Sequence, residues 1–408
     1  MKPMMRPWLG LGVLFIVAAL TSCRPAMDTQ HPDEPAVDEQ DVTDVLSFRW
    51  HYQRFLERLV ASDGRVIDRS TERRISTSEG QAYGMWFALL SDDRGTFEKL
   101  LQWADANLAR GRLGDQLPAW LWGRSDDGDW RILDENPAVD ADIWMTYALF
   151  AGAERWQEPR YAALAHRLSR RILETSTRQQ NGQRILLPAP FGFTRDNYVL
   201  MNPSYLTLTV FEGLAAYSED ARWLELERSS RRLFLALLNT GNGVVPDWLG
   251  VSSPVEIVPF EQLEARDQDV VAYGSYDAIR TYLWLWWDAQ RQSDERLFHG
   301  LSRIYHLTDE RGFPPERLSF HDEVASGIGP IGFSGLLLPV LSSYDAAFGT
   351  RSAEEQRNRI QARNPERYQD LYYDQMLLLF GLSALGCVEF LSDARLDLTA
   401  EGMRDCAL

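Results

Sequence analysis

From about residue 43 to residue 391, the chain is a succession of amphipathic segments with the period of α-helices. Apolar residues recur at positions i, i+3, i+4 and i+7 in most of these segments, and no strand-like alternation runs long enough for a βαβ array. Twelve segments are expected to be helical: Val45–Ala61, Gln81–Leu90, Thr96–Ala109, Asp142–Ala153, Tyr161–Glu174, Tyr205–Tyr217, Ala221–Leu238, Tyr276–Gln292, Asp294–Tyr305, Phe333–Ala347, Ala353–Ala362 and Leu371–Phe390. Because no linker-like break separates them, they predict one closed all-α domain.

A helical bundle or a solenoid is the competing architecture, but the sequence shows no repeat of the lengths typical of helical solenoids. Short strand pairings are compatible with two stretches, Ile185–Pro188 and Val244–Val251. The helical domain is expected to span residues 45–395, followed by a tail of residues 396–408.

Charge and composition exclude several classes of function. The formal net charge is −17, which has the wrong sign for binding the phosphates of nucleic acid. Three Cys and six His without clustering predict neither a metal centre nor a redox cofactor. The aromatic load of 14 Trp, 15 Tyr and 18 Phe can fill a large core, and it also suits a carbohydrate cleft, where rings stack on sugar C–H faces.

The first residues have the features of an export signal. Basic Lys2 and Arg6 precede an apolar run from Trp8 to Leu20, which is too short to span a bilayer comfortably. The run ends in Leu20-Thr21-Ser22-Cys23, which resembles the lipobox of bacterial lipoproteins. That resemblance implies that residues 1–22 are removed and that Cys23 carries a lipid, with ordinary secretory cleavage as the alternative.

The residues after Cys23 refine this expectation. Arg24 rather than Asp follows the cysteine, which in such lipoproteins indicates sorting to the outer membrane, with the protein in the periplasm. Residues 23–44 are rich in Pro and acidic residues and lack an apolar period, so they predict a solvated tether. In that oxidising compartment Cys387 and Cys406 can pair, although the sequence leaves the question open.

Acidic residues are the remaining candidates for chemistry, because the chain lacks a His-Glu-x-x-His motif, a Gly-x-Ser-x-Gly motif and a phosphate-binding glycine loop. Glu79 follows Ser78 at a helix start, where it either stabilises the first turn or, buried against Tyr83, serves as a general acid. Asp140 and Asp142 suit either helix capping or catalysis. Asp277 and Arg280 suit either a salt bridge on one helix face or an oriented general base.

Several motifs, in their order and spacing, resemble the family 8 glycoside hydrolases, in particular the periplasmic endoglucanases associated with bacterial cellulose synthesis. The resemblance runs from about Arg65 to Gly381. In the family signature around the two Asp residues, Val139 and Thr146 replace usual residues, while both carboxylates are retained. The motifs are Gly64–Asp68, Thr77–Gln81, Leu117–Gly123, Asn202–Leu206, Pro246–Trp248, Ser275–Arg280 and Gly329–Ser334.

The resemblance implies an (α/α)6 barrel of six inner and six outer helices, in agreement with the helices expected above. It also implies endo-acting hydrolysis of β-1,4-glucan (a cellulase activity) with inversion, linked to bacterial cellulose biosynthesis. Glu79 falls on the general acid, Asp277 on the general base, and Asp140 on the carboxylate that holds the sugar. The expected substrate-binding residues are Asp142, Tyr83, Trp120, Trp122, Tyr205, Trp248, Tyr276 and Arg280, and core packing remains an alternative for Trp120, Trp122, Tyr205 and Trp248.

Two other functions keep some of these features. A catalytically silent glucan-binding lipoprotein would retain the aromatic residues, although the intact Glu79, Asp140 and Asp277 argue against it. A xylanase or chitosanase of the same family would retain the carboxylates. The expected partners are therefore a β-1,4-glucan chain, a membrane reached through the lipid on Cys23, and a cellulose synthase or export complex, but not nucleic acid.

Overall fold

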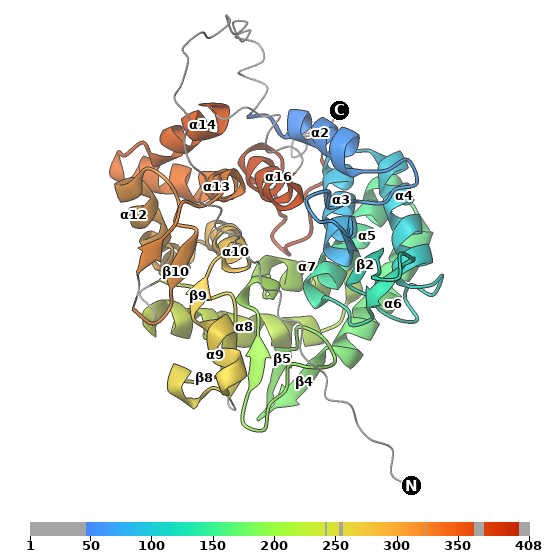
Figure 1. Ribbon diagram of the computed structural model, residues 1–408, viewed down its shortest axis with the longest axis horizontal. Helices are drawn as coiled ribbons and strands as arrows, with labels where there is room; N and C mark the ends of the chain where they lie inside the picture. The colour runs from blue at the N-terminus through green and yellow to red at the C-terminus, as the bar shows by residue number, and fades with distance from the viewer. Residues whose placement is uncertain (1–45, 241–242, 253–255, 323, 363–370, 400–408) are drawn as a thin grey trace, which may run out of the picture. The chain divides into compact units, whose positions relative to one another are not determined.

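Six helices form an inner ring in the computed structural model, which describes residues 46–240, 243–252, 256–322, 324–362 and 371–399. Each inner helix contacts the next one, and the last contacts the first, so the ring closes (Figure 1). The inner helices are α3 (Ser78–Leu90), α5 (Val139–Trp156), α7 (Leu208–Ser218), α10 (Ala278–Gln292), α13 (Ile331–Phe348) and α16 (Tyr372–Gly386).

An outer layer of helices covers this ring. In order around the ring, α4 packs on α3, α6 on α5, α8 on α7, α11 on α10, α14 on α13, and α2 on α16, while α12 also contacts α13. This arrangement is an (α/α)6 barrel and confirms the predicted all-α fold. The outer helices are α2 (Phe48–Leu59), α4 (Arg94–Trp103), α6 (Pro159–Thr175), α8 (Arg222–Thr240), α11 (Glu295–Gly300), α12 (Ser302–Arg311) and α14 (Ser352–Ala362).

The difference between the layers follows from the sequence. Helix α6 is amphipathic and buries only the face that carries Tyr161, Leu168 and Ile172. Inner helices α13 and α16 are apolar nearly all round, as a helix surrounded by other helices must be. Helix α13 is long and apolar enough to cross a membrane, but it is mostly buried within the ring.

Helices α13 and α16 approach each other closely because both carry glycine at the contact. A Cβ atom added to Gly381 would lie 1.9 Å from the carbonyl oxygen of Gly335. No side chain fits at that position without a shift of the backbone, so this glycine pair fixes the spacing of the two helices.

All twelve predicted helical segments are helical, with shifted ends. Helix α3 begins at Ser78, three residues before the expected start, which places Glu79 in its first turn. Tyr205 lies in a 3-10 turn, Pro203–Tyr205, and α7 begins only at Leu208. The segment Asp294–Tyr305 divides at Leu301 into α11 and α12. A short helix that the sequence did not predict, α9 (Ala265–Val271), precedes α10.

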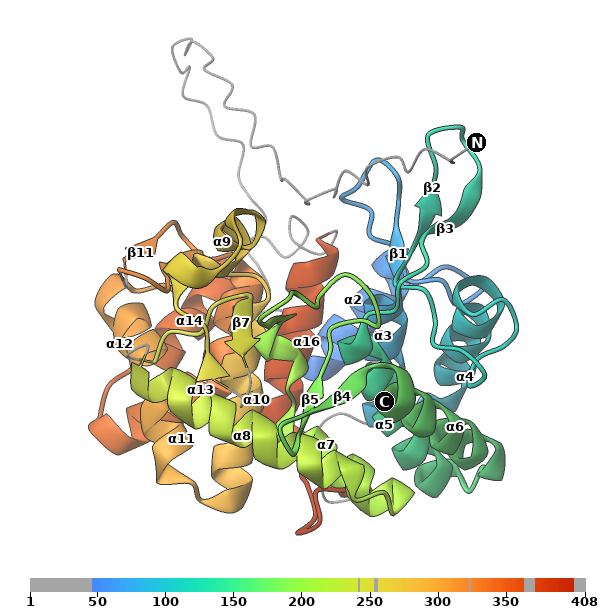
Figure 2. The ribbon, with the colours of Figure 1, turned by 90° about the horizontal axis from the view of Figure 1, so that it is seen from below.

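Short strands occupy the connections between helices, mostly at one end of the barrel (Figure 2). The strand β1 leads directly into α3, and β9 directly precedes the start of α10. The expected pairings near Ile185–Pro188 and Val244–Val251 correspond to β5 and β7, whereas the other sheets were not predicted. The sheets are β1 (Ser76–Thr77), β2 (Leu121–Arg124) and β3 (Trp130–Asp134); β4 (Thr177–Gln180) and β5 (Gln183–Leu186); β6 (Val199–Met201), β7 (Leu249–Ser252) and β8 (Glu256–Ile257); and β9 (Tyr273–Gly274), β10 (Arg317–Ser319) and β11 (Ala325–Ser326).

Several predictions concern residues outside the described part of the chain. The signal peptide of residues 1–22, the lipid site Cys23, the tether of residues 23–44 and Cys406 all fall there, as does most of the tail of residues 396–408. Cys387, at the end of α16, is disulfide-bonded.

Candidate active site

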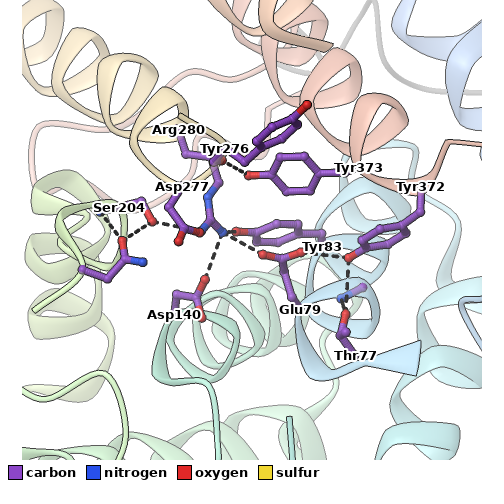
Figure 3. Close-up of polar contacts among 12 residues, drawn as sticks. Thr77, Glu79, Tyr83, Asp140, Ser204, Tyr276, Asp277, Arg280, Tyr372 and Tyr373 are labelled. Carbon is purple, nitrogen blue, oxygen red and sulfur yellow. Dashed lines mark hydrogen bonds and ion pairs between the residues drawn. The ribbon is translucent and has the colours of Figure 1, made fainter. Parts of the chain in front are cut away.

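The side chain of Arg280 brings the predicted site residues together (Figure 3). Its Nη1 donates to Glu79 Oε2 at 2.7 Å, to Tyr83 Oη at 2.7 Å and to Asp140 Oδ2 at 3.0 Å. Its Nη2 donates to Asp277 Oδ1 at 2.7 Å and to Ser204 Oγ at 2.9 Å. Because Arg280 is only 1% exposed, the guanidinium replaces its lost hydration with these five acceptors.

The three carboxylates lie at the amino-terminal ends of three inner helices. Glu79 and Asp140 occupy the second positions of α3 and α5, and Asp277 is the residue that precedes α10. Backbone N–H groups and the helix dipole make these ends favourable for negative charge. The side chain of Thr77 accepts the N–H of Gly80 and caps α3, which leaves the carboxylate of Glu79 free for Arg280.

Glu79 has the environment of a proton donor. Burial raises the pKa of Glu79 to about 7, and the charge of Asp140 acts in the same direction, while Arg280 opposes the shift. The other carboxyl oxygen, Oε1, accepts a hydrogen bond from the Tyr372 hydroxyl at 3.0 Å. Glu79 is therefore substantially protonated at neutral pH and has two donors ready for its ionised form.

Asp140 and Asp277 differ in their access to solvent. The side chain of Asp140 is 3% exposed, burial raises its pKa, and its Oδ1 has no hydrogen-bond partner among the described residues. The side chain of Asp277 is 35% exposed and bonds Arg280 through Oδ1. Asp140 thus has a buried oxygen without a partner, and Asp277 is the carboxylate that water reaches most readily.

Asp142 and Tyr83 are buried, which bears on their predicted contacts with substrate. Asp142 is fully buried, and neither of its carboxyl oxygens has a partner in the described part of the chain. Burial, and then the charge of Asp140, raise the pKa of Asp142 well above its usual range. Tyr83 is 1% exposed, and its hydroxyl oxygen accepts a hydrogen bond from Arg280. In this structure neither side chain presents a surface to a sugar.

Two predicted tryptophans, Trp120 just before β2 and Trp122 in β2, are partly exposed. Trp120 precedes β2, and its backbone carbonyl accepts the N–H of Ser78 at the start of α3. The Trp122 ring has the Arg65 guanidinium 4.3 Å from its centroid and lies 5.2 Å from Trp130, nearly parallel to it. These contacts favour a packing role for Trp122, whereas Trp130, which the sequence analysis did not select, is 47% exposed.

The other predicted aromatic residues are close to the start of α10. Trp248 stacks on Phe193, with ring centroids 5.4 Å apart, and lies 6.3 Å from Tyr205. Tyr276, next to Asp277, is 44% exposed, and its ring packs edge-on against Phe333. Tyr276 therefore combines an exposed ring with adjacency to a site carboxylate.

Three residues that support the site were not among the predicted site residues: Asp247, although it lies in the quoted motif Pro246–Trp248, Tyr372 and Tyr373. The hydroxyl of Tyr373 donates to the backbone carbonyl of Tyr276, and Asp247 accepts backbone N–H groups at the start of α10. The only signal for the two tyrosines was their position at the predicted start of the last inner helix. Among the described residues, no group of three or more His, Cys, Asp or Glu side chains has an arrangement that could hold a metal ion.

Comparison with known proteins identifies related chains. Residues 41–386 match the profile of the family described as Glycosyl hydrolases family 8. The chain is 36% identical over 334 residues to an endoglucanase of Escherichia coli strain K12. The aligned region covers 81% of this chain and 85% of the E. coli protein. The chain is 37% identical, with the same coverage, to an endoglucanase of Salmonella typhi.

A solved structure agrees with the fold. The crystal structure of an endo-1,4-D-glucanase from Vibrio fischeri ES114 superposes with a TM-score of 0.78 at 32% identity. The match covers 85% of this chain and 98% of the Vibrio chain.

Replacing Arg280 by methionine should destabilise the protein in a pH-dependent way. Arg280→Met leaves Glu79 and Asp140 buried without their cation, which should reduce the free energy of unfolding by about 3–5 kcal/mol at pH 8. The loss should be smaller at pH 5, because burial raises the pKa values of both carboxyls, and they then take up protons instead of remaining charged.

Urea unfolding at the two pH values measures this difference. Arg73→Met is the control, since its ion pair with Asp126 is on the surface, and it should change the unfolding free energy by less than about 1 kcal/mol at either pH. An equal loss for Arg280→Met at pH 5 and pH 8 would show that carboxyl protonation does not compensate for the missing cation.

Proposed function

The chain belongs to glycosyl hydrolase family 8, and on that premise we propose that it is an endo-acting β-1,4-glucanase that inverts the configuration of the cleaved bond. The observation that carries this proposal is the convergence of Glu79, Asp140 and Asp277 on one buried arginine. An inverting hydrolase needs a protonated carboxyl and an ionised carboxylate on opposite sides of the scissile bond. The different environments of Glu79 and Asp277 suit these two roles.

In this proposal Glu79 is the general acid. It donates its proton to the glycosidic oxygen as the bond breaks, and the carboxylate that remains accepts hydrogen bonds from Arg280 and Tyr372. Both donors are already in place before the reaction, so the charge that develops on Glu79 is stabilised without reorganisation of the site. With a pKa of about 7, the carboxyl of Glu79 is mostly protonated below neutral pH.

Asp277 is the general base and Asp140 binds the sugar. Asp277 deprotonates a water molecule that attacks the anomeric carbon from the face opposite to the leaving group. Arg280 orients Asp277 through the bond to Oδ1 and leaves its other oxygen for that water. The proposed role of Asp140 is to accept a ring hydroxyl through its buried, unpartnered Oδ1, and a bond that strengthens in the transition state would contribute to the rate. Tyr276, Trp248 and Tyr205 are proposed to contact neighbouring glucose rings.

The N-terminal sequence supports a proposal about location. We propose that Cys23 carries a lipid that anchors the enzyme to the outer membrane on its periplasmic side. The basic start, the apolar run and the Leu20–Cys23 motif support this anchor, and residues 23–44 then separate the barrel from the membrane. An enzyme in this location would act on glucan that a cellulose synthase and export complex delivers, which is the proposed link to cellulose biosynthesis.

The proposed roles predict the effect of isosteric amides. Glu79→Gln and Asp277→Asn should each lower kcat on carboxymethyl-cellulose by about a thousandfold, because neither amide can exchange the required proton. Reducing-sugar release measures the rate, and Asp126→Asn, at an exposed surface ion pair, should keep wild-type activity.

Two further readouts belong to the same experiment. Proton NMR of early products should show the α-anomer first, whereas the β-anomer would indicate a covalent intermediate and a different mechanism. Xylan and chitosan, assayed in parallel, should be hydrolysed more slowly than carboxymethyl-cellulose. Faster release from either polymer would reassign the substrate within the family.

The rate should depend on pH through Glu79. The wild-type kcat/KM should decline above about pH 7, because the general acid must carry its proton. In Tyr372→Phe the ionised form of Glu79 loses a hydrogen-bond donor, so the pKa of Glu79 rises and the alkaline limb should move to higher pH. Tyr161→Phe removes a similar hydroxyl from Glu98 on an outer helix and should leave the profile unchanged. A shift to lower pH in Tyr372→Phe would contradict the role of Glu79.

The proposed lipid anchor predicts a change in fractionation. Cys23→Ser should move the enzyme from the membrane to the soluble periplasmic fraction without a change in specific activity, because each buried CH₂ of an acyl chain contributes about 0.8 kcal/mol to membrane binding. Mass spectrometry of the wild-type N-terminus identifies the lipid. A soluble wild-type protein without a lipid would favour ordinary secretion instead.

A further inference from the structure

One oxygen of Asp247 holds the segment that carries Asp277. Asp247 Oδ1 accepts the backbone N–H groups of Ser275 at 2.8 Å, of Asp277 at 3.0 Å and of Ala278 at 2.7 Å. Three N–H bonds to one acceptor fix the orientation of three peptide units between Ser275 and Ala278. Asp247 and Asp277 are 30 residues apart in the sequence, so this contact ties the segment before β7 to the start of α10.

Asp247 is itself held in place by the strand before α10. Its backbone N–H donates to the carbonyl of Tyr273 at 2.8 Å. The next residue, Gly274, lies so close to the facing chain that an added Cβ would be 1.9 Å from the carbonyl oxygen of Val245. On the other side, Ser275 Oγ donates to the Glu316 carbonyl at 2.6 Å. The carboxylate of Asp247 is therefore fixed relative to residues 275–278.

The side chain of Asp277 takes no part in capping α10. An aspartate that caps a helix with its own side chain has an extended backbone, whereas Asp277, directly before α10, has helical backbone angles (φ −81°, ψ −51°). Here the side chain of Asp277 makes no capping bond. The N–H of Ala278, the first residue of α10, is instead satisfied by Asp247, and the carboxylate of Asp277 is directed to Arg280.

We propose that Asp247 is a positioning residue for the general base: by accepting the N–H groups of Ser275, Asp277 and Ala278, it fixes the backbone from which the carboxylate of Asp277 reaches Arg280 and stays available to water. The inference rests on the proposed function of Asp277. Without these bonds, a shift of this backbone segment would move the reactive oxygen of Asp277 by an ångström or more, a displacement that costs about a hundredfold in rate.

The role assigned to Asp247 requires an oxygen acceptor and not a negative charge. Burial, followed by the nearby charge of Asp277, raises the pKa of Asp247 to about 7, while the three N–H bonds oppose the shift. A carboxyl oxygen accepts N–H groups in either protonation state, and so does the oxygen of an amide. Asparagine should therefore replace Asp247, and alanine should not.

The test compares Asp247→Ala, Asp247→Asn and a matched control. Asp247→Ala should lower kcat on carboxymethyl-cellulose by about a hundredfold with KM within about twofold of wild type, and Asp247→Asn should restore kcat to within about tenfold of wild type. The control is Asp93→Ala, because Asp93 caps the outer helix α4 and also accepts the Tyr52 hydroxyl. It should lower the melting temperature and leave kcat unchanged.

Two kinetic outcomes would overturn the inference. Wild-type kcat in Asp247→Ala would show that the three N–H bonds do not position the base. Equal loss in Asp247→Asn and Asp247→Ala would show that the charge of Asp247 matters, which makes it a participant in proton transfer and not a positioning residue.

A crystal structure of Asp247→Ala separates this inference from the proposed function. We expect the backbone of residues 275–278 to shift and the carboxylate of Asp277 to leave Arg280. If Asp277 stayed on Arg280, the inference would be wrong whatever the activity. If the wild-type protein did not hydrolyse glucan, the proposed function would fail, and the position of Asp277 in the variant would still decide the structural role of Asp247.

Discussion

The burial of the Arg280 guanidinium is the interaction on which the site depends. A cation that is 1% exposed is stable only if charged or polar partners surround it, and here the partners come from α3, α5, the 3-10 turn before α7, and α10. Three carboxylates around one cation leave a net charge of −3 + 1 = −2 when all are ionised. Burial makes that state costly, so a proton is retained, and the raised pKa of Glu79 indicates where.

The barrel makes this arrangement possible because it brings the amino-terminal ends of its inner helices together. Glu79, Asp140 and Asp277 each occupy such an end, where backbone N–H groups and the helix dipoles favour negative charge. The apolar inner helices contribute packing and spacing, as the contact between Gly335 and Gly381 illustrates. The chemistry is therefore confined to the helix ends and to the loops and short strands that precede them.

At two of these helix ends, one side chain binds the backbone N–H groups and a different side chain is the proposed reactive carboxylate. Thr77 caps α3 while Glu79 bonds Arg280 and Tyr372, and Asp247 binds the N–H groups at the start of α10 while Asp277 bonds Arg280. In both cases a neighbouring side chain satisfies the backbone, and the reactive carboxylate is held by side chains alone. Side-chain contacts can therefore set the proton affinity and the orientation of each carboxylate without changing the helix.

The sequence by itself determined the helical periods, and with them one all-α domain, because each apolar face must be buried against another helix. The barrel was implied only by the resemblance to family 8. Motif order was also sufficient to select Glu79, Asp140, Asp277 and Arg280 as candidate residues. Only the tertiary structure decided that one arginine joins all three carboxylates, that Asp142 is fully buried, and that Tyr372 and Asp247 support the site. The physical reason is separation along the chain: Tyr372 and Glu79 are 293 residues apart, and no local pattern records a hydrogen bond that forms only when the ring of helices closes.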